Sequence, residues 1–278
     1  MLGKLFKYEF KNTAKVMLAI YGVLVFTTLL VSIGSSMKAM QGVNLTDVPP
    51  VVELFFAASV LMYVLSIFAL FTVSYVYLCI HFYKTMYSDQ GYLTHTLPVK
   101  PVTLFNVKLV TSLVWMILTA VLFALSIFAF LIGASRGEIF SSEVAGRMAE
   151  IIKYEFVPIF GMTFGQFLLF IILSFIISCL SYLLMIFASI SIGQLFTGHK
   201  IAGSFAAGVV IYMVQQVIAT IVILVTGFST FLDYEKIVTF ADVLFSPAMI
   251  ISMVISVLFT VALYVICIVM QTRHLNLD

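Results

Sequence analysis

Charged residues are scarce in this chain of 278 residues: they make up 9% of it, whereas 63% of the residues are hydrophobic. A soluble domain typically has about a quarter of its residues charged. A surface with so few charges is solvated by lipid rather than by water, and the mean hydropathy of +1.20 agrees with this. The net charge of only +2, without a basic run that pairs with aromatic residues, does not suggest a nucleic-acid partner.

Cysteine is almost as rare, with three residues in the whole chain. Cys79, Cys179 and Cys267 all lie in apolar stretches, and no two of them have the spacing of metal ligands. The odd number and the apolar surroundings argue against a disulfide framework. We interpret all three as small buried hydrophobic residues.

Motifs of enzymatic chemistry are missing too. The chain has no GxxxxGK[ST] phosphate-binding loop and no HExxH motif, and its four histidines are scattered. The apolar stretches contain no acidic residue that could activate a nucleophile. We therefore predict that the chain is not an enzyme in its own right and binds no cofactor or metal ion.

What the sequence has in abundance is long apolar runs. A helix needs about 20 apolar residues to cross a bilayer, and six stretches are long enough. The fourth has room for two spans, but residues 167–192 contain no Gly, Pro, Asn, Asp or Lys that would favour a turn. The sequence thus predicts an all-α polytopic membrane protein, a single membrane domain over residues 1–278, with spans at about 16–37, 54–80, 109–135, 160–194, 203–231 and 245–270.

The distribution of Lys and Arg predicts the orientation, because cations concentrate in cytoplasmic loops. With the N-terminus inside, the inner segments contain Lys4, Lys7, Lys11, Lys15, Lys84, Lys100, Lys108, Lys200 and Arg273, against Glu9, Asp89 and Asp278. The outer segments contain Lys38, Arg136, Arg147, Lys153 and Lys236, and they carry Asp47, Glu53, Glu138, Glu143, Glu150, Glu155, Asp233, Glu235 and Asp242. Both ends are therefore predicted to be cytoplasmic.

The first fifteen residues have the pattern of an amphipathic helix that lies in the inner membrane interface. On a helical wheel the lysines at 4, 7, 11 and 15 share one side, and the opposite side is apolar. Glu9 interrupts the apolar side, either as a tolerated acid or because it meets a polar partner. The residues of interest in this predicted interfacial helix are Lys4, Phe6, Lys7, Glu9, Phe10 and Lys11.

The inner loop at 81–108 is the longest predicted connection on the cytoplasmic side. Ser88 is a suitable N-cap and Pro98 ends any helix that begins there, which predicts a short helix from Asp89 to Thr96. Tyr92, Leu93 and Leu97 either dock into a groove on another protein or pack on the membrane helices of this chain.

Two segments resemble a known family. The tail "KLFKYEFKN" and the loop "MYSDQGYLTHTLPVKPVTLFNVKL" are similar to the permease subunits of ABC-2 type ABC transporters, above all to bacterial six-span permeases for the export of, or immunity to, peptide antibiotics. The family pattern resembles "sdegYLtxtLPvs…K". Residues that match it are Ser88, Asp89, Gly91, Tyr92, Leu93, Thr94, Thr96, Leu97, Pro98 and Lys108, while Gln90, Lys100 and Pro101 depart from it.

The resemblance implies a half-transporter in the bacterial plasma membrane. A cytoplasmic ABC ATPase subunit would hold ATP and Mg and would contact a coupling helix here, at Asp89, Gly91, Tyr92, Leu93 and Leu97. A second permease protomer, of the same or a related chain, would complete the pathway. The expected substrate is a peptide, a lipid-like molecule or another amphipathic compound. The family also suggests a re-entrant element, for which residues 233–247 are the candidate, with a plain loop as the alternative.

Three glutamines lie within or near the predicted spans and either line a solute pathway or bridge helices: Gln166, Gln215 and Gln216. Gly161 and Gly165 form a GxxxG pair, which fits a close helix contact within the protomer or in a dimer.

Two other functions fit the same sequence. One is a membrane scaffold or sensor that recruits a cytoplasmic protein through the inner loop without transporting anything. The other is an ion-coupled secondary carrier, which usually keeps an ionisable residue in the membrane. The predicted spans of this chain contain no acidic residue, which favours an energy source outside the chain.

Overall fold

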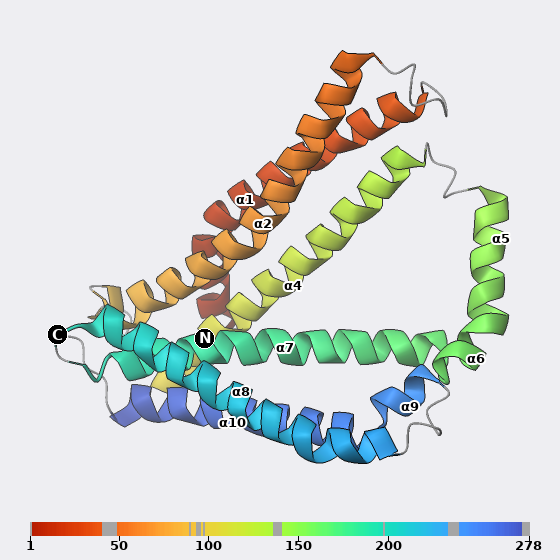
Figure 1. Ribbon diagram of the computed structural model, residues 1–278. Helices are drawn as coiled ribbons and strands as arrows, with labels where there is room; N and C mark the ends of the chain where they lie inside the picture. The colour runs from red at the N-terminus through yellow and green to blue at the C-terminus, as the bar shows by residue number, and fades with distance from the viewer. Residues whose placement is uncertain are drawn as a thin grey trace. The chain divides into compact units, whose positions relative to one another are not determined.

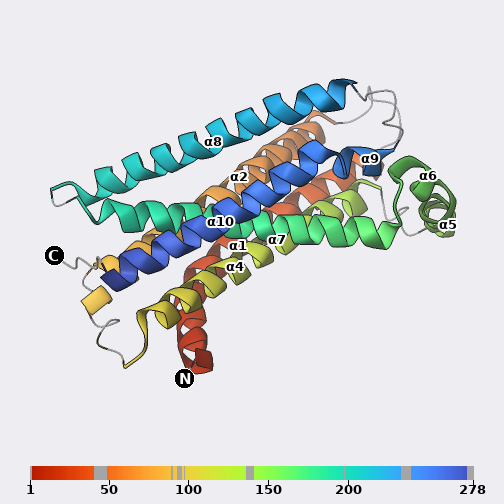
Figure 2. The ribbon, with the colours of Figure 1, turned by 90° about the horizontal axis from the view of Figure 1, so that it is seen from below.

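Every secondary-structure element that the computed structural model describes is a helix, and Figures 1 and 2 show that most of the chain forms long helices. The described residues are 2–40, 49–88, 90–92, 96, 98–135, 141–196, 198–232 and 239–273. The elements are α1 (Leu2–Met40), α2 (Pro50–Tyr87), α4 (Pro101–Ala134), α5 (Ser142–Glu150), the π-helical turn η2 (Ile151–Glu155), α6 (Phe156–Phe160), α7 (Phe164–Gly193), α8 (Lys200–Leu232), α9 (Phe240–Leu244) and α10 (Pro247–Arg273).

Six of these helices are long and apolar enough to cross a membrane, which confirms the predicted number of spans: α1, α2, α4, α7, α8 and α10. The fourth apolar stretch contains one helix of 30 residues, α7, as the absence of turn-forming residues predicted. The chain is therefore a multi-pass membrane protein in its fold.

The helices extend beyond the predicted spans because hydropathy marks only the apolar part of each one. Three of them, α2, α4 and α10, begin with a proline. Proline suits the first position of a helix, where its fixed φ fits and its missing N–H has no partner to lose. The helix α4 consequently starts at Pro101, inside the region predicted as the inner loop.

The chain divides into two compact units. The first, here unit 1, contains Gly3–Leu78 and Val114–Ala149. The second, unit 2, contains Cys79–Leu113 and Glu150–Asp278. Unit 1 thus holds α1 with the larger parts of α2 and α4, and unit 2 holds the other ends of α2 and α4 together with α7, α8 and α10.

Hydroxyl groups connect the helices of unit 1. Thr27 of α1 shares a 2.7 Å hydrogen bond with Ser66 of α2, and Tyr63 of α2 shares one of 3.0 Å with Ser126 of α4. Farther along, Ser36 of α1 donates to the carbonyl oxygen of Gly133 in α4 at 3.0 Å. A Cβ atom on Gly133 would lie 2.8 Å from the carbonyl oxygen of Ser32, so the backbones approach closely there. Small residues and polar bridges of this kind are typical of helix packing in membranes.

In unit 2, α7 packs against α8 and α10, and α8 packs against α10 (Figure 2). The α7–α8 hairpin is tight at its turn, where a Cβ on Gly193 would lie 2.5 Å from the Cα of Ser204. At the same end, Phe82 of α2 stacks on Phe187 of α7 with ring centroids 3.9 Å apart. We call this the Tyr87 end of unit 2, because α2 ends there.

A cluster of phenylalanines closes the opposite end of unit 2. Phe160 of α6 lies 5.1 Å from Phe167 of α7 and 5.6 Å from Phe240 of α9, measured between ring centroids. Gly161 ends α6 with φ +69°, and a Cβ there would lie 2.6 Å from the Thr239 hydroxyl. Glycine is required here for two reasons. It adopts the left-handed conformation of the helix cap without strain, and it leaves room for the segment that begins α9.

Candidate functional site

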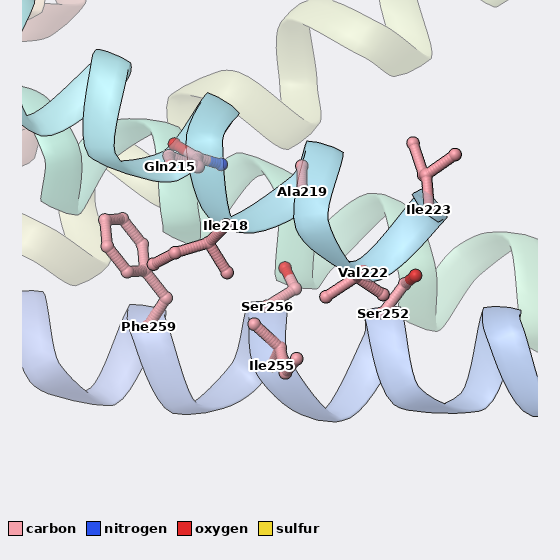
Figure 3. Close-up of a pocket in the computed structure, with 9 residues that line it drawn as sticks. All are labelled: Gln215, Ile218, Ala219, Val222, Ile223, Ser252, Ile255, Ser256 and Phe259. Atoms are coloured by element: carbon pink, nitrogen blue, oxygen red, sulfur yellow. The ribbon is translucent and has the colours of Figure 1, made fainter. Parts of the chain in front are cut away.

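A cavity of about 240 Å³ lies between α8 and α10 in unit 2 (Figure 3). Its residues recur every three or four positions on each helix, so that one face of α8 meets one face of α10. The cavity is lined by Gln215, Ile218, Ala219, Val222, Ile223, Ser252, Ile255, Ser256 and Phe259. None of these nine residues carries a charge.

The polar groups of the cavity are one amide and two hydroxyls. Gln215 lies near the middle of α8, and Ser252 and Ser256 are one turn apart on α10. Figure 3 shows the Ser256 hydroxyl directed from α10 toward α8. Such groups can exchange hydrogen bonds with an uncharged polar part of a solute, while the aliphatic and aromatic walls favour an apolar remainder.

A second and larger cavity, about 670 Å³, borders the other side of α10. Its walls come from α7, α9 and α10 and are almost entirely apolar, with Ser174 and Ser252 as the polar exceptions. Ser252 lines both cavities, so they share one turn of α10.

The three predicted glutamines have different surroundings. Gln215 lines the polar cavity, whereas Gln216 is exposed and does not line it. Gln166 is a capping residue: its Oε1 accepts from the Thr163 N–H at 3.0 Å, and its own N–H donates to the Thr163 hydroxyl. This capping box fixes the start of α7.

The predicted coupling helix is described in part. Residues 90–92 are helical, and the Gly91 N–H donates to the Ser88 carbonyl oxygen at 2.6 Å. Gly91 itself is buried, and Tyr92 has 53% of its surface exposed. Asp89, Leu93 and Leu97 lie outside the described residues. Their predicted contact with an ATPase subunit stays a prediction.

The tail is the first part of α1 rather than a separate helix, since α1 is continuous from Leu2. Figures 1 and 2 show that its first turns are bent away from the axis of the rest. The Thr13 hydroxyl donates to the carbonyl oxygens of Glu9 and Phe10, both at 3.1 Å, and back-bonding of this kind bends helices. Lys4, Lys7 and Lys11 are exposed, whereas Phe6, Glu9 and Phe10 are half-buried.

The single tryptophan holds the bent tail in place within unit 1. Phe10 stacks on Trp115 of α4 with centroids 4.4 Å apart and an interplanar angle of 8°. The Trp115 Nε1–H donates to the Thr13 hydroxyl at 2.7 Å, and Tyr21 donates to the Trp115 carbonyl oxygen. Glu9 of the tail lies near Tyr77 of α2. The interfacial location of the tail stays a prediction.

Sequence reasoning missed Ser252, Ser256 and the cavity. The available signal was two serines one turn apart in the last span, but their meeting with Gln215 depends on how α8 and α10 pack. The outer candidate, residues 233–247, is described from Thr239 onward, where Thr239 and Asp242 cap the five-residue helix α9. Comparison with models of known protein families, with curated proteins and with solved structures found no match.

Thr13→Val tests how the tail is held. The change removes the only hydrogen-bond acceptor shown for the buried Trp115 Nε1–H, and an unpaired buried donor costs about 1–3 kcal/mol. We expect a lower free energy of unfolding in detergent and a shift of the tryptophan emission, which comes from Trp115 alone. Thr72→Val is the matched control, since the exposed Thr72 hydroxyl donates to its own helix. Equal emission and stability in both variants would contradict this role.

Proposed function

We propose that the chain is the membrane subunit of an ATP-driven ABC-2 type transporter. In this proposal it exports a peptide, lipid-like or other amphipathic substrate across the bacterial plasma membrane, with both ends in the cytoplasm. A separate ATPase subunit holds ATP and Mg, and a second permease protomer completes the pathway. The observation that carries the proposal is the polar but uncharged cavity at the middle of two membrane-spanning helices.

The cavity supports transport because it offers hydrogen-bonding groups where lipid offers none. A polar amide at bilayer depth is costly unless it finds a partner in the protein or in a solute. Gln215 is only half-buried and faces a cavity lined by Ser252 and Ser256. An amphipathic molecule could therefore place its uncharged polar group here and its apolar part along Ile218, Val222 or Phe259.

The absence of charge in the cavity bears on the energy source. An ion-coupled carrier usually binds its ion through a carboxylate in the membrane, and no lining residue of either cavity is acidic. In this proposal the energy for transport therefore comes from a partner protein. The loop before α4 presents the exposed Tyr92 beside a helical turn, and an exposed aromatic on a short helix suits docking into a groove on that partner.

The loop is tested with Tyr92→Ala and with deletion of Gly91–Leu97. Loss of an aromatic anchor weakens an interface by about 1–2 kcal/mol or more, so Tyr92→Ala should lower the ATP hydrolysis that co-purifies with the tagged chain several-fold. The deletion should abolish it without preventing membrane insertion. Tyr154→Ala is the matched control, because Tyr154 is also exposed, at 65% against 53% for Tyr92, but lies in η2, on the predicted outer side. Unchanged hydrolysis after the deletion would exclude this role of the loop.

The cavity is tested with Ser256→Cys in a chain whose three native cysteines are replaced by serine. A thiol reacts as the thiolate, which forms in water but not in lipid. We expect a charged methanethiosulfonate reagent to modify Cys at 256 during ATP turnover. It should not modify Val261→Cys, because Val261 is exposed as Ser256 is but lies on a face of the same helix that does not line the cavity. Equal reaction at the two positions would argue against a pathway between α8 and α10.

A further inference from the structure

Four polar side chains are buried together at the Tyr87 end of unit 2. The Tyr87 hydroxyl of α2 donates to the Ser191 hydroxyl of α7 at 2.8 Å. Gln194 follows Ser191 by three residues, at the end of α7, and Gln271 of α10 lies beside Tyr87. All four side chains are at most 4% exposed. Three helices thus end around one buried polar cluster.

The two amides of this cluster are poorly satisfied. Within the described part of the chain, Oε1 of Gln194 makes no hydrogen bond, and the amide of Gln271 makes none of regular geometry although it faces the Tyr87 hydroxyl. The Nε2 of Gln194 donates to the Ile190 carbonyl oxygen of its own helix at 3.3 Å. Buried polar groups without partners bear the full cost of leaving water, so the packed arrangement stores free energy that water would release.

Aromatic contacts oppose that cost. Phe82 stacks on Phe187 at an interplanar angle of 9°, and Phe105 of α4 contacts both rings edge-on. All three rings are at most 1% exposed. The same end of unit 2 is thus held together by apolar packing and pushed apart by unsatisfied amides. Opposing contributions of this kind are what a two-state element requires.

The cluster and the cavity lie along the same helix, α10. Phe259 lines the cavity, and Gln271 follows it by three turns of α10, about 18 Å along the helix axis. Leu263 and Cys267, between them, are at most 3% exposed. The face of α10 between the cavity and the cluster is therefore packed against the rest of unit 2.

We propose that the Tyr87 end is a hydration gate. When the ends of α2, α7 and α10 separate, water reaches the amides of Gln194 and Gln271 and the cavity opens to that side. When they close, the rings of Phe82, Phe105 and Phe187 pack again and the amides lose their water. The gate rests on the proposed function, because the ATPase partner would supply the energy that opens it.

Cys267 is a native reporter of this gate. It is fully buried, lies one turn before Gln271 and borders Tyr87, so a charged thiol reagent reaches it only when the end opens. The test measures the rate of its modification in open membrane fragments from a Cys79→Ser, Cys179→Ser chain, with and without ATP. Gln194→Leu with Gln271→Leu should lower the rate about tenfold or more, because leucine removes the cost of the closed state. Phe82→Ala should raise it.

The control is Thr272→Val, next to Gln271 but exposed, whose hydroxyl bonds only its own helix. An unchanged rate in the double leucine variant would overturn the gate and leave the proposed function intact. The other informative result is a lower modification rate in the double leucine variant, with ATP changing the rate in neither the parent chain nor the variant. This result would support the gate and contradict the ATP-driven function. If the double variant does not elute as the parent does in gel filtration, the single Gln271→Leu variant is measured instead. Its Cys267 modification rate should fall by less than that expected for the double variant.

Discussion

The need to satisfy hydrogen-bonding groups without water governs this structure. Unit 1 meets it with hydroxyl pairs between helices, such as Thr27 with Ser66 and Tyr63 with Ser126. Among the described residues, the buried side-chain atoms without a partner are the Ser74 hydroxyl of unit 1 and amide atoms of Gln194 and Gln271 at the Tyr87 end of unit 2. The half-buried Gln215 lines the cavity of unit 2. Departures from full satisfaction are expected where a protein binds a solute or changes conformation. The cavity around Gln215 and the Tyr87 end, where several polar groups lie together, are the places on which the proposed function rests.

Much of the fold was predictable because membrane insertion leaves a strong signal in the sequence. Six spans followed from hydropathy, and α7 was predicted as one helix because its interior lacks turn-forming residues. The ends were less accurate, since amphipathic segments such as the tail continue a helix without being apolar. Gln166 was read as a possible pathway residue although Thr163 and Gln166 have the spacing of a capping box. Gly161 was read as part of a helix-contact motif, whereas it ends α6 at positive φ.

The candidate site was predictable only through Gln215. The cavity requires that Ser252 and Ser256 of α10 face α8, and no local pattern states which helices pack together. The same holds for the cluster of Tyr87, Ser191 and Gln271, whose members are far apart in the sequence. Together these features suggest a simple account. An uncharged cavity accepts an amphipathic solute, an end with opposing packing and hydration costs opens and closes, and a partner acting on the loop around Tyr92 supplies the energy.

The identity of that partner decides the central claim. The direct measurement is gentle extraction of the tagged chain from its native membrane in several mild detergents, followed by mass spectrometry of the proteins that remain bound. The account predicts a soluble ATPase with a GxxxxGK[ST] phosphate-binding loop, in stoichiometric amount. Recovery of the chain without any ATPase in every detergent would contradict it and would favour a scaffold or an ion-coupled carrier.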